Sequence, residues 1–170
     1  MKLDVDIAML FRENLNNMDD IKYMKEAFKE AKKAYELNEV PVGCVIVCDD
    51  KIIARAHNLR HNKKCSIYHA EMIAIEEACA KLNRWILNDC TIYVTFEPCL
   101  MCTGAIIQSR INRLVYALSE ERFGCMNDAF EYFKNKQNHN VSVTKGILEE
   151  EARIIFKDFF KKMRDEKKNK

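Results

Sequence analysis

The sequence predicts a layered α/β domain in which helices cover a single sheet. Two observations support this fold class. Short β-rich segments alternate with helical segments along the chain, which is typical of such domains. The 170 residues, 48% of them hydrophobic and 32% charged, suffice for one globular domain with a sizeable core. We therefore expect an N-terminal extension over 1–19, one domain over 20–164 and a basic tail over 165–170.

The first half of the domain is predicted to hold two helices and two strands. Asp19 or Asp20 can cap the first helix, along which apolar side chains recur at helical spacing. A β-rich run typical of a buried strand follows, and Asp49-Asp50-Lys51 forms the turn to its neighbour. The second helix is apolar nearly all round in its first turns, as expected of a buried helix. The expected elements are a helix over 20–37, strands over 40–48 and 52–56, a loop over 58–68 and a helix over 69–81.

The second half is also predicted to alternate strands with helices. Pro98 can open a helix because proline is tolerated at the first helical position. The last helix carries an apolar face that includes Leu148, Phe156 and Phe159. The expected elements are a strand over 90–96, a helix over 98–109, a strand over 114–117, a small helix near 128–133, an edge strand over 141–145 and a helix over 148–163.

The N-terminal segment is a poor secretory signal, because its apolar run over 7–11 is short and follows Asp4 and Asp6. We expect a disordered extension or a short docking helix there. Without an export signal, the eight cysteines indicate a reducing compartment, so we expect a cytoplasmic protein. No uncharged apolar stretch approaches the roughly 20 residues that cross a bilayer, so no membrane partner is expected.

Four residues carry the most informative pattern: His69, Glu71, Cys99 and Cys102. One imidazole and two thiols at Cys-x-x-Cys spacing are zinc-type ligands, and no fourth protein ligand accompanies them. Structural zinc sites have four protein ligands, whereas catalytic sites keep one position for water. Zinc lowers the pKa of bound water to about 7, and Glu71 is placed to handle the proton. Glu97 is a rival carboxylate that we expect to be structural.

Each half of this pattern has a simpler explanation when it stands alone. A Cys-x-x-Cys pair also occurs in redox centres and in structural zinc sites. A His-x-Glu pair is explained by an exposed histidine and a glutamate on a helix surface. Here both halves occur in order, each at a predicted helix start, and the combination favours catalytic zinc.

Charge gives a weaker indication of a partner. The net charge is only +2, so it does not by itself predict a nucleic-acid ligand. Basic side chains nevertheless gather between Arg55 and Lys64, and six Lys or Arg stand against Asp165 and Glu166 in the last ten residues. Such clusters contact phosphates in some proteins and form solvated surface in others.

Several stretches between about residue 20 and Arg164 are informative when they are taken together. They are Glu39 to Gly43, His69-Ala70-Glu71, Tyr93 to Cys102, Ser109 to Ile111 with Arg113, Asn138-His139, Gly146 to Leu148 and Phe159-Phe160. In these stretches the chain resembles the tRNA-specific adenosine deaminases of the zinc-dependent cytidine and deoxycytidylate deaminase family. The short cytidine deaminases share the zinc motif but lack the Val-Pro-Val-Gly start and the Phe-Phe-basic end.

The resemblance implies a cytidine-deaminase-like, three-layer α/β/α domain around one mixed five-stranded sheet, and a homodimer. It also implies hydrolytic deamination of adenosine to inosine at the wobble position of a tRNA anticodon, chiefly in an arginine tRNA. The attack at C6 would come from a zinc-bound hydroxide. The implied partner is the tRNA anticodon loop. The implied cofactor is one zinc ion per subunit, with no organic cofactor.

The resemblance also assigns roles by matching position. Glu71 is the catalytic proton shuttle. The implied zinc ligands are His69, Cys99 and Cys102. The implied substrate-binding residues are Asn58 and the Ala70 backbone at the flipped base, and Lys161 and Arg164 along the RNA.

Two segments depart from the family pattern. Residues 65–68 read Cys-Ser-Ile-Tyr where the family usually has Asp-Pro-Thr-Ala, and residues 117–120 read Ala-Leu-Ser-Glu where it has Gly-Ala-x-Asp. We expect both to border the RNA channel and to affect the choice of tRNA. One alternative is therefore the catalytic subunit of a heterodimeric tRNA deaminase. Others are a deaminase of free bases or nucleotides of the guanine or cytosine type, and an inactive zinc-stabilised subunit, against which Glu71 argues.

Overall fold

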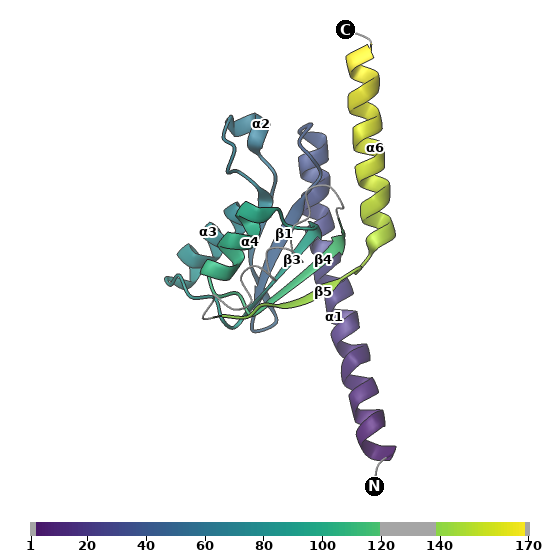
Figure 1. Ribbon diagram of the computed structural model, residues 1–170, viewed down its shortest axis with the longest axis vertical. Helices are drawn as coiled ribbons and strands as arrows, with labels where there is room; N and C mark the ends of the chain where they lie inside the picture. Colours follow the sequence, from purple (N-terminus) through teal and green to yellow (C-terminus); the bar gives the residue numbers. More distant parts are fainter. Residues whose placement is uncertain (1–2, 120–138, 169–170) are drawn as a thin grey trace.

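The computed structural model of the protein describes residues 3–119 and 139–168, with side chains from residue 17 onward (Figure 1). The small helix predicted near 128–133 lies outside the described residues. The helices are α1 (Leu3–Glu36), α2 (Arg60–Lys63), α3 (Ala70–Leu82), α4 (Leu100–Gln108) and α6 (Glu149–Lys168). The strands are β1 (Gly43–Cys48), β2 (Lys51–His57), β3 (Cys90–Phe96), β4 (Arg113–Leu118) and β5 (Ser142–Lys145).

Within the described residues, five strands form one mixed sheet in the order β2-β1-β3-β4-β5. β1 runs antiparallel to β2 and to β3, whereas β4 is parallel to both β3 and β5. β1 is buried throughout, as expected of a strand that is covered on both faces. Most of β5 is exposed, as expected at an edge. The predicted mixed five-stranded sheet is confirmed.

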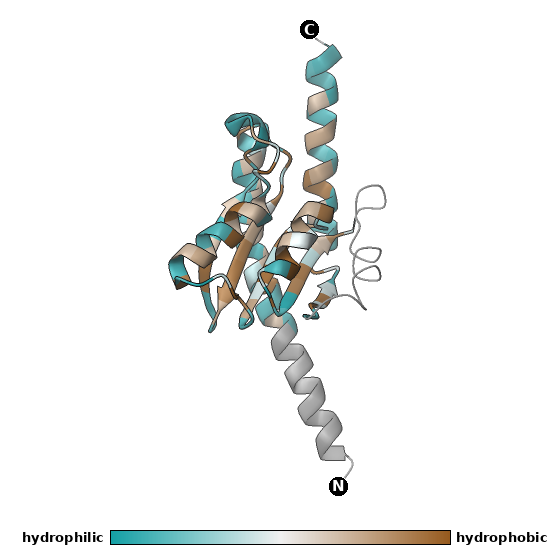
Figure 2. Ribbon diagram, turned by 60° about the vertical axis from the view of Figure 1, so that its left-hand side comes forward, coloured by the Kyte–Doolittle hydropathy of each residue, from teal (hydrophilic) through white to brown (hydrophobic). Residues whose placement is uncertain are grey.

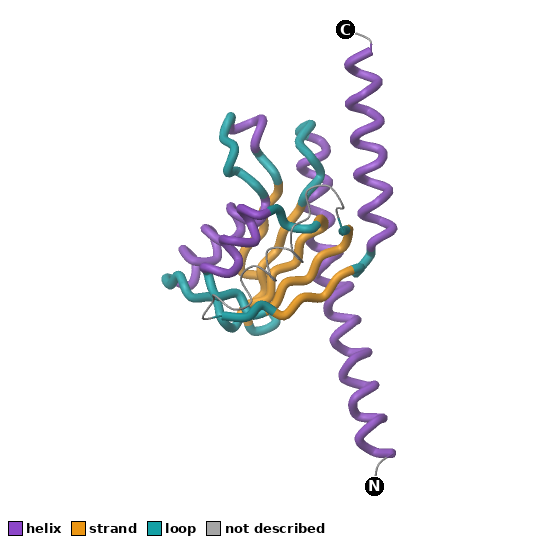
Figure 3. The backbone as a smooth tube through the Cα atoms, viewed as in Figure 1, coloured by secondary structure: helices purple, strands orange, loops and turns teal. Residues whose placement is uncertain are grey.

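Helices cover both faces of the sheet and make the predicted three layers. Figures 1 and 3 show α3 and α4 on one face and α1 with α6 on the other. α1 packs against β1, β2 and β3, α3 packs against β1 and β2, and α6 packs against β4. The core fills the space between these layers, and Figure 2 shows apolar residues concentrated along the central strands.

α1 lies close to β1 because the residues that meet there are small. Ala27, Ala31 and Ala34 have no exposed surface. A Cβ atom at Gly43 would lie 2.0 Å from the Ala27 carbonyl oxygen and 2.3 Å from the Ala31 nitrogen. Glycine is therefore required at the first residue of β1, because any side chain there would overlap the backbone of α1.

α1 begins at Leu3, so the prediction that Asp19 or Asp20 caps this helix is wrong. Asp20 is instead buried, and Arg113 of β4 donates hydrogen bonds of 2.8 and 2.6 Å to its two carboxylate oxygens. The Tyr93 hydroxyl donates a third, of 3.0 Å. Aspartate favours the cap position, but here its long-range ion pair ties α1 to the sheet. The boundary between the extension over 1–19 and the domain stays a prediction.

Three further differences from the prediction concern helices. Part of the predicted loop over 58–68 forms α2. Cys99 occupies the position before the first residue of α4, so Pro98 lies outside that helix rather than at its first position. α6 continues to Lys168, beyond the predicted end at residue 163. The last two differences concern helix ends, where local propensity competes with contacts made by distant residues. No described helix combines the length and the apolar composition that a membrane crossing would need.

Candidate active site

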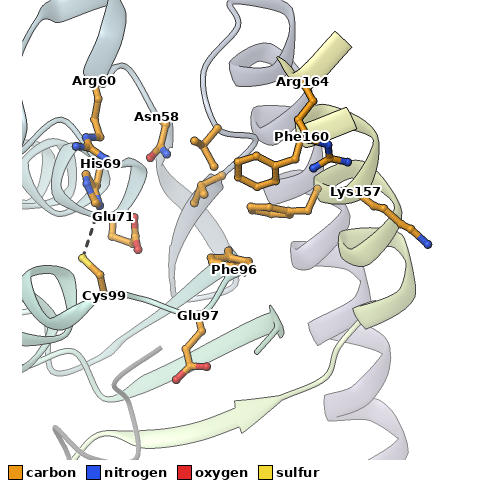
Figure 4. A pocket seen from close by; sticks show the side chains of 13 residues that line it. Asn58, Arg60, His69, Glu71, Phe96, Glu97, Cys99, Lys157, Phe160 and Arg164 are labelled. Carbon is orange, nitrogen blue, oxygen red and sulfur yellow. Dashed lines mark hydrogen bonds between the residues drawn. The ribbon is translucent and has the colours of Figure 1, made fainter. Parts of the chain in front are cut away.

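Two helix starts meet beside the sheet and bring the three predicted zinc ligands together. Figure 4 shows two of them, His69 and Cys99. His69 immediately precedes α3 and Cys99 immediately precedes α4, both with extended backbone. Cys102 lies in the first turn of α4 and is fully buried. His69 is thus the residue before its helix and not, as predicted, the first residue within it. Three atoms from two distant segments of the chain therefore face one point.

The three candidate ligand atoms form a nearly equilateral triangle. His69 Nδ1 lies 3.7 Å from Cys99 Sγ and 3.5 Å from Cys102 Sγ, and the two Sγ atoms are 3.7 Å apart. In a tetrahedron, Zn–S bonds of about 2.3 Å and Zn–N bonds of about 2.0 Å give S···S edges of about 3.8 Å and S···N edges of about 3.5 Å. The spacing therefore fits zinc. It also excludes a disulfide, whose S–S bond is about 2.05 Å long.

The protonation of the two thiols differs. The contact with Cys102 lowers the pKa of Cys99 to about 3, and His69 lowers it further against the opposing effect of burial. The contact with Cys99, together with burial, raises the pKa of Cys102. A thiolate is therefore ready at Cys99, and a divalent cation would supply the charge that a second thiolate at Cys102 needs.

Glu71 lies in the first turn of α3 and is buried, with 3% of its surface exposed. Among the described residues, no group hydrogen-bonds its Oε2 atom. Burial raises the pKa of this carboxyl group, because desolvation disfavours its charged form. A buried carboxylate oxygen without a protein partner, next to three metal-type ligands, is suited to accept and return a proton.

A cavity of 840 Å³ extends from this cluster to α6 (Figure 4). Its volume lies in the upper part of the range of about 300–1,000 Å³ that is usual for small-molecule sites. Cations from α2 and α6 stand at its walls beside apolar and aromatic side chains. The lining residues are Val40, Val42, Asn58, Arg60, His69, Glu71, Phe96, Glu97, Cys99, Phe156, Lys157, Phe160 and Arg164.

The structure brings some of the predicted substrate-binding residues to the cavity. Asn58 and Arg164 line it, whereas Ala70 and Lys161 do not. The Asn58 side-chain oxygen accepts a hydrogen bond of 2.9 Å from the Ala70 backbone N–H. This bond fixes the amide plane of Asn58 and occupies the Ala70 nitrogen. Lys161 is exposed on α6. The substrate roles of these residues stay predictions.

Sequence reasoning missed the aromatic wall of the cavity. The rings of Phe96 and Phe156 stack with centroids 4.2 Å apart and an interplanar angle of 19°. Phe160 lies one helical turn beyond Phe156, with centroids 6.4 Å apart and 45% of its surface exposed. The spacing of Phe156 and Phe159 predicted a core face of α6. Phe159 is buried as predicted, whereas Phe156 also lines the cavity. In the sequence, nothing except its charge indicated that Lys157 would line a cavity.

Glu97, the rival carboxylate, also lines the cavity. Figure 4 shows its side chain turned away from the His69 and Glu71 side chains. Its backbone N–H donates to the Leu118 carbonyl oxygen at 2.9 Å, which continues the pairing of β3 with β4. Glu71 is therefore the carboxylate that accompanies the candidate metal ligands.

Comparison with known protein families shows the general class of protein to which the chain belongs. A sequence model of the MafB19-like deaminase family matches residues 18–164. The match spans the sheet, both helix starts and most of α6, and therefore includes every residue that lines the cavity. The fold, the site and this match define the chain as a deaminase.

Comparison with individual proteins identifies a narrower family within the deaminases. The tRNA-specific adenosine deaminase of Bacillus subtilis (strain 168) is 47% identical over 147 residues, which cover 86% of this chain and 91% of the relative. That of Rickettsia bellii (strain RML369-C) is 44% identical over 145 residues, 84% of this chain and 100% of the relative. The chain belongs to the family of tRNA-specific adenosine deaminases.

Solved structures agree with this assignment. One, from studies of A-to-I editing by tRNA:A34 deaminases at the wobble position of transfer RNA, has a TM-score of 0.74 and 36% identity. The match covers 79% of this chain and 98% of the chain in that structure. The structure of guanine deaminase from Bacillus subtilis has a TM-score of 0.57 and 32% identity. This match covers 71% of this chain and 81% of the guanine deaminase chain. The cytidine-deaminase-like fold is thus confirmed.

Proposed function

We propose that this chain hydrolyses adenosine to inosine and ammonia at the wobble position of a tRNA anticodon, chiefly in an arginine tRNA. Relatives at 43–47% identity over most of the chain are tRNA-specific adenosine deaminases, and a structural relative is an A34 deaminase. The observation that carries the proposal is the cavity itself. It joins the His69, Cys99 and Cys102 triangle and Glu71 to an aromatic and basic wall.

In this proposal, His69, Cys99 and Cys102 hold one zinc ion per subunit. When bound, zinc lowers the pKa of water to about 7 and so supplies a nucleophile at neutral pH. The protein contributes the proton transfers. Glu71 takes a proton from the attacking water through its unpartnered Oε2 atom and delivers it to the ring nitrogen. It then takes the second proton, from the oxygen now bonded to the base carbon, and delivers it to the departing amine. Its burial favours the protonated form that must donate.

The remaining lining residues bind and orient the RNA. Asn58, whose oxygen is fixed by Ala70, presents its amide N–H groups to the base. The exposed ring of Phe160 offers a surface on which a base that leaves the anticodon stack can lie. Arg60 and Arg164 stand on opposite walls and suit the phosphates. An anticodon loop fits such a cavity because its bases are single-stranded and leave the stack at low cost.

The direct test is to incubate the purified protein with an anticodon stem-loop that carries adenosine at the wobble position. Inosine is then read as an A-to-G change by sequencing. Free adenosine, guanine and cytidine serve as parallel substrates. Conversion of the stem-loop supports the proposal, and turnover of the small compounds alone would refute it.

A deaminase of free bases is the second candidate, favoured by the likeness to guanine deaminase from Bacillus subtilis. Such an enzyme needs the candidate metal ligands and Glu71 but has no need of cations on α6. Salt dependence separates the two candidates. A tRNA substrate requires KM to rise steeply with ionic strength, whereas turnover of a neutral base would be nearly insensitive to salt.

We further propose that the enzyme is a cytoplasmic homodimer. Large apolar side chains are exposed in or near α3 and α4. Leu100, the first residue of α4, is 59% exposed; Trp85, which follows α3, is 60% exposed; and Ile67, which precedes α3, is 51% exposed. Association that covers them would lower the exposed apolar area. Light scattering after size exclusion gives the mass directly: a monomer alone, or activity that needs a different partner chain, would favour the heterodimeric alternative.

A further inference from the structure

The turn that follows α1, residues 37–39, contacts both walls of the cavity. On one side it reaches α2, which carries Arg60. On the other it reaches α6, which carries Phe160 and Arg164. Figures 1 and 3 show the end of α1, α2 and the far half of α6 rising from the same end of the sheet. The turn thus lies where it can set the separation of the two walls.

Glu39 makes the contact with α2. Its carboxylate is buried, with 1% of the residue exposed. Oε1 accepts hydrogen bonds from the Asn62 backbone N–H at 2.8 Å and from the Asn62 side-chain amide at 3.1 Å. The same amide nitrogen lies 3.3 Å from the Leu37 carbonyl oxygen. Asn62 is therefore held through both its backbone and its side chain.

These bonds are important because α2 has little else to hold it. It is four residues long and has no buried residue, so hydrophobic packing does not fix its position. Backbone bonds such as Cys65 N–H to Arg60 O and Leu59 N–H to Tyr68 O close the loop on itself without attaching it to another element. Among the described residues, the hydrogen bonds that join α2 to another segment of the domain are those of Asn62 to Glu39 and Leu37.

The opposite wall is fixed to the same turn. The Lys162 ammonium donates a hydrogen bond of 2.7 Å to Asn38 Oδ1 and lies 5.1 Å from the centroid of the Tyr35 ring. The Tyr35 hydroxyl donates to Asp158 at 2.6 Å. Asn38 has a left-handed backbone, with φ of 58°, which asparagine tolerates better than most residues. α6 is therefore held by residues other than Glu39 and Asn62.

We propose that Glu39 is a positioning residue for RNA binding: through Asn62 it fixes α2 and so places the Arg60 guanidinium at the cavity. This inference rests on the proposed function. Glu39 does not line the cavity and touches no reacting group. When α2 is fixed, Arg60 is already held in place in the free protein. Less conformational entropy is then lost when the RNA binds.

A double-mutant cycle tests the proposal. Deamination of an anticodon stem-loop is measured at fixed ionic strength for wild type, Asn62→Ala, Arg60→Ala and the double variant. We expect Arg60→Ala to raise KM about tenfold and Asn62→Ala to raise it about fivefold, with kcat within about twofold. The double variant should have the KM of Arg60→Ala, because a loosened α2 no longer matters once the guanidinium is gone.

Two further comparisons make the test specific. Asn62→Ala combined with Arg164→Ala should multiply the separate KM effects, because Arg164 is attached to α6. Glu39→Gln keeps an oxygen that accepts from Asn62, so its KM should stay close to wild type. Glu39→Leu removes the bonds to both the backbone and the side chain of Asn62, so it should raise KM at least as much as Asn62→Ala, which keeps the backbone bond. An unchanged KM in Glu39→Leu, a loss confined to kcat, or a full further rise in KM when Asn62→Ala is added to Arg60→Ala would each overturn the proposal. A wild-type protein that leaves the stem-loop unconverted would instead refute the proposed function.

Discussion

Replacing Gly43 with alanine should destabilise the protein more than its one added methyl group would suggest. The new Cβ would lie 2.0 Å from the Ala27 carbonyl oxygen and 2.3 Å from the Ala31 nitrogen. Both are backbone atoms of α1, so no side-chain rotation can relieve the overlap. Contacts of real Cβ atoms are essentially never shorter than 3.0 Å, and α1 must therefore move away from β1 by about 1 Å or more.

That movement affects a large part of the core, because α1 packs against β1, β2, β3 and β4. Added methylenes in a packed core cost about 1–3 kcal/mol when side chains can adjust, and here they cannot. We expect Gly43→Ala to lower the free energy of unfolding by about 3 kcal/mol or more. For a chain of this size, the melting temperature would fall by about 6–12 °C.

Gly104→Ala is the matched control, because a Cβ there meets no atom within 4 Å. Gly104 lies in α4, where alanine stabilises a helix by about 1 kcal/mol relative to glycine. Both variants are compared with wild type by thermal and urea unfolding followed by far-UV circular dichroism, at equal zinc. A Gly43→Ala protein that melts within about 2 °C of wild type would refute the packing of α1 on β1 described above.

Three other predictions follow from the site and the core. Glu71→Ala should keep bound zinc and the melting temperature but lower kcat by about 10²–10⁴-fold, and near-normal turnover would assign the proton transfers elsewhere. Cys99→Ala should lose zinc, measured by atomic absorption, together with much of the stability, and unchanged zinc content would remove it from the ligands. Burial, with the nearby Asp20 charge, raises the pKa of Tyr93, so this phenol stabilises the fold fully below about pH 10 and less as pH rises beyond it. Unfolding free energy should therefore fall more steeply above pH 10 in wild type than in Tyr93→Phe, by up to about 1 kcal/mol per pH unit, and parallel curves would contradict this.

Local pattern was sufficient for the strands and for the residues of the metal-type cluster. The strand predicted over 90–96 has the observed bounds, because its β-branched and aromatic residues and its flanks are local properties of the sequence. His69 and Cys99 each lie within one residue of the helix starts predicted at 69 and 98. The pairing of the strands into one mixed sheet and the meeting of His69 with the two cysteines required the family resemblance.

Features that depend on distant partners were not predictable. Asp20 has the local properties of a helix cap, but it lies inside α1. Its carboxylate is paired with Arg113, which is 93 residues away in the sequence. The role of Glu39 depends on Asn62, an exposed residue in a segment that the sequence indicates to be a loop. Phe156 has the spacing of a core residue, and its place beside the cavity follows from how α6 crosses the sheet. In each case, tertiary contacts outweigh local preference.

The exposure of Trp85 has a practical consequence for spectroscopy. It is the single tryptophan of the chain, and 60% of its surface is accessible to solvent in the isolated subunit. Its emission should already be red-shifted and readily quenched by acrylamide in the native state, so intrinsic fluorescence would respond weakly to denaturant. A blue shift that appears as protein concentration rises would instead report that another subunit has covered this indole.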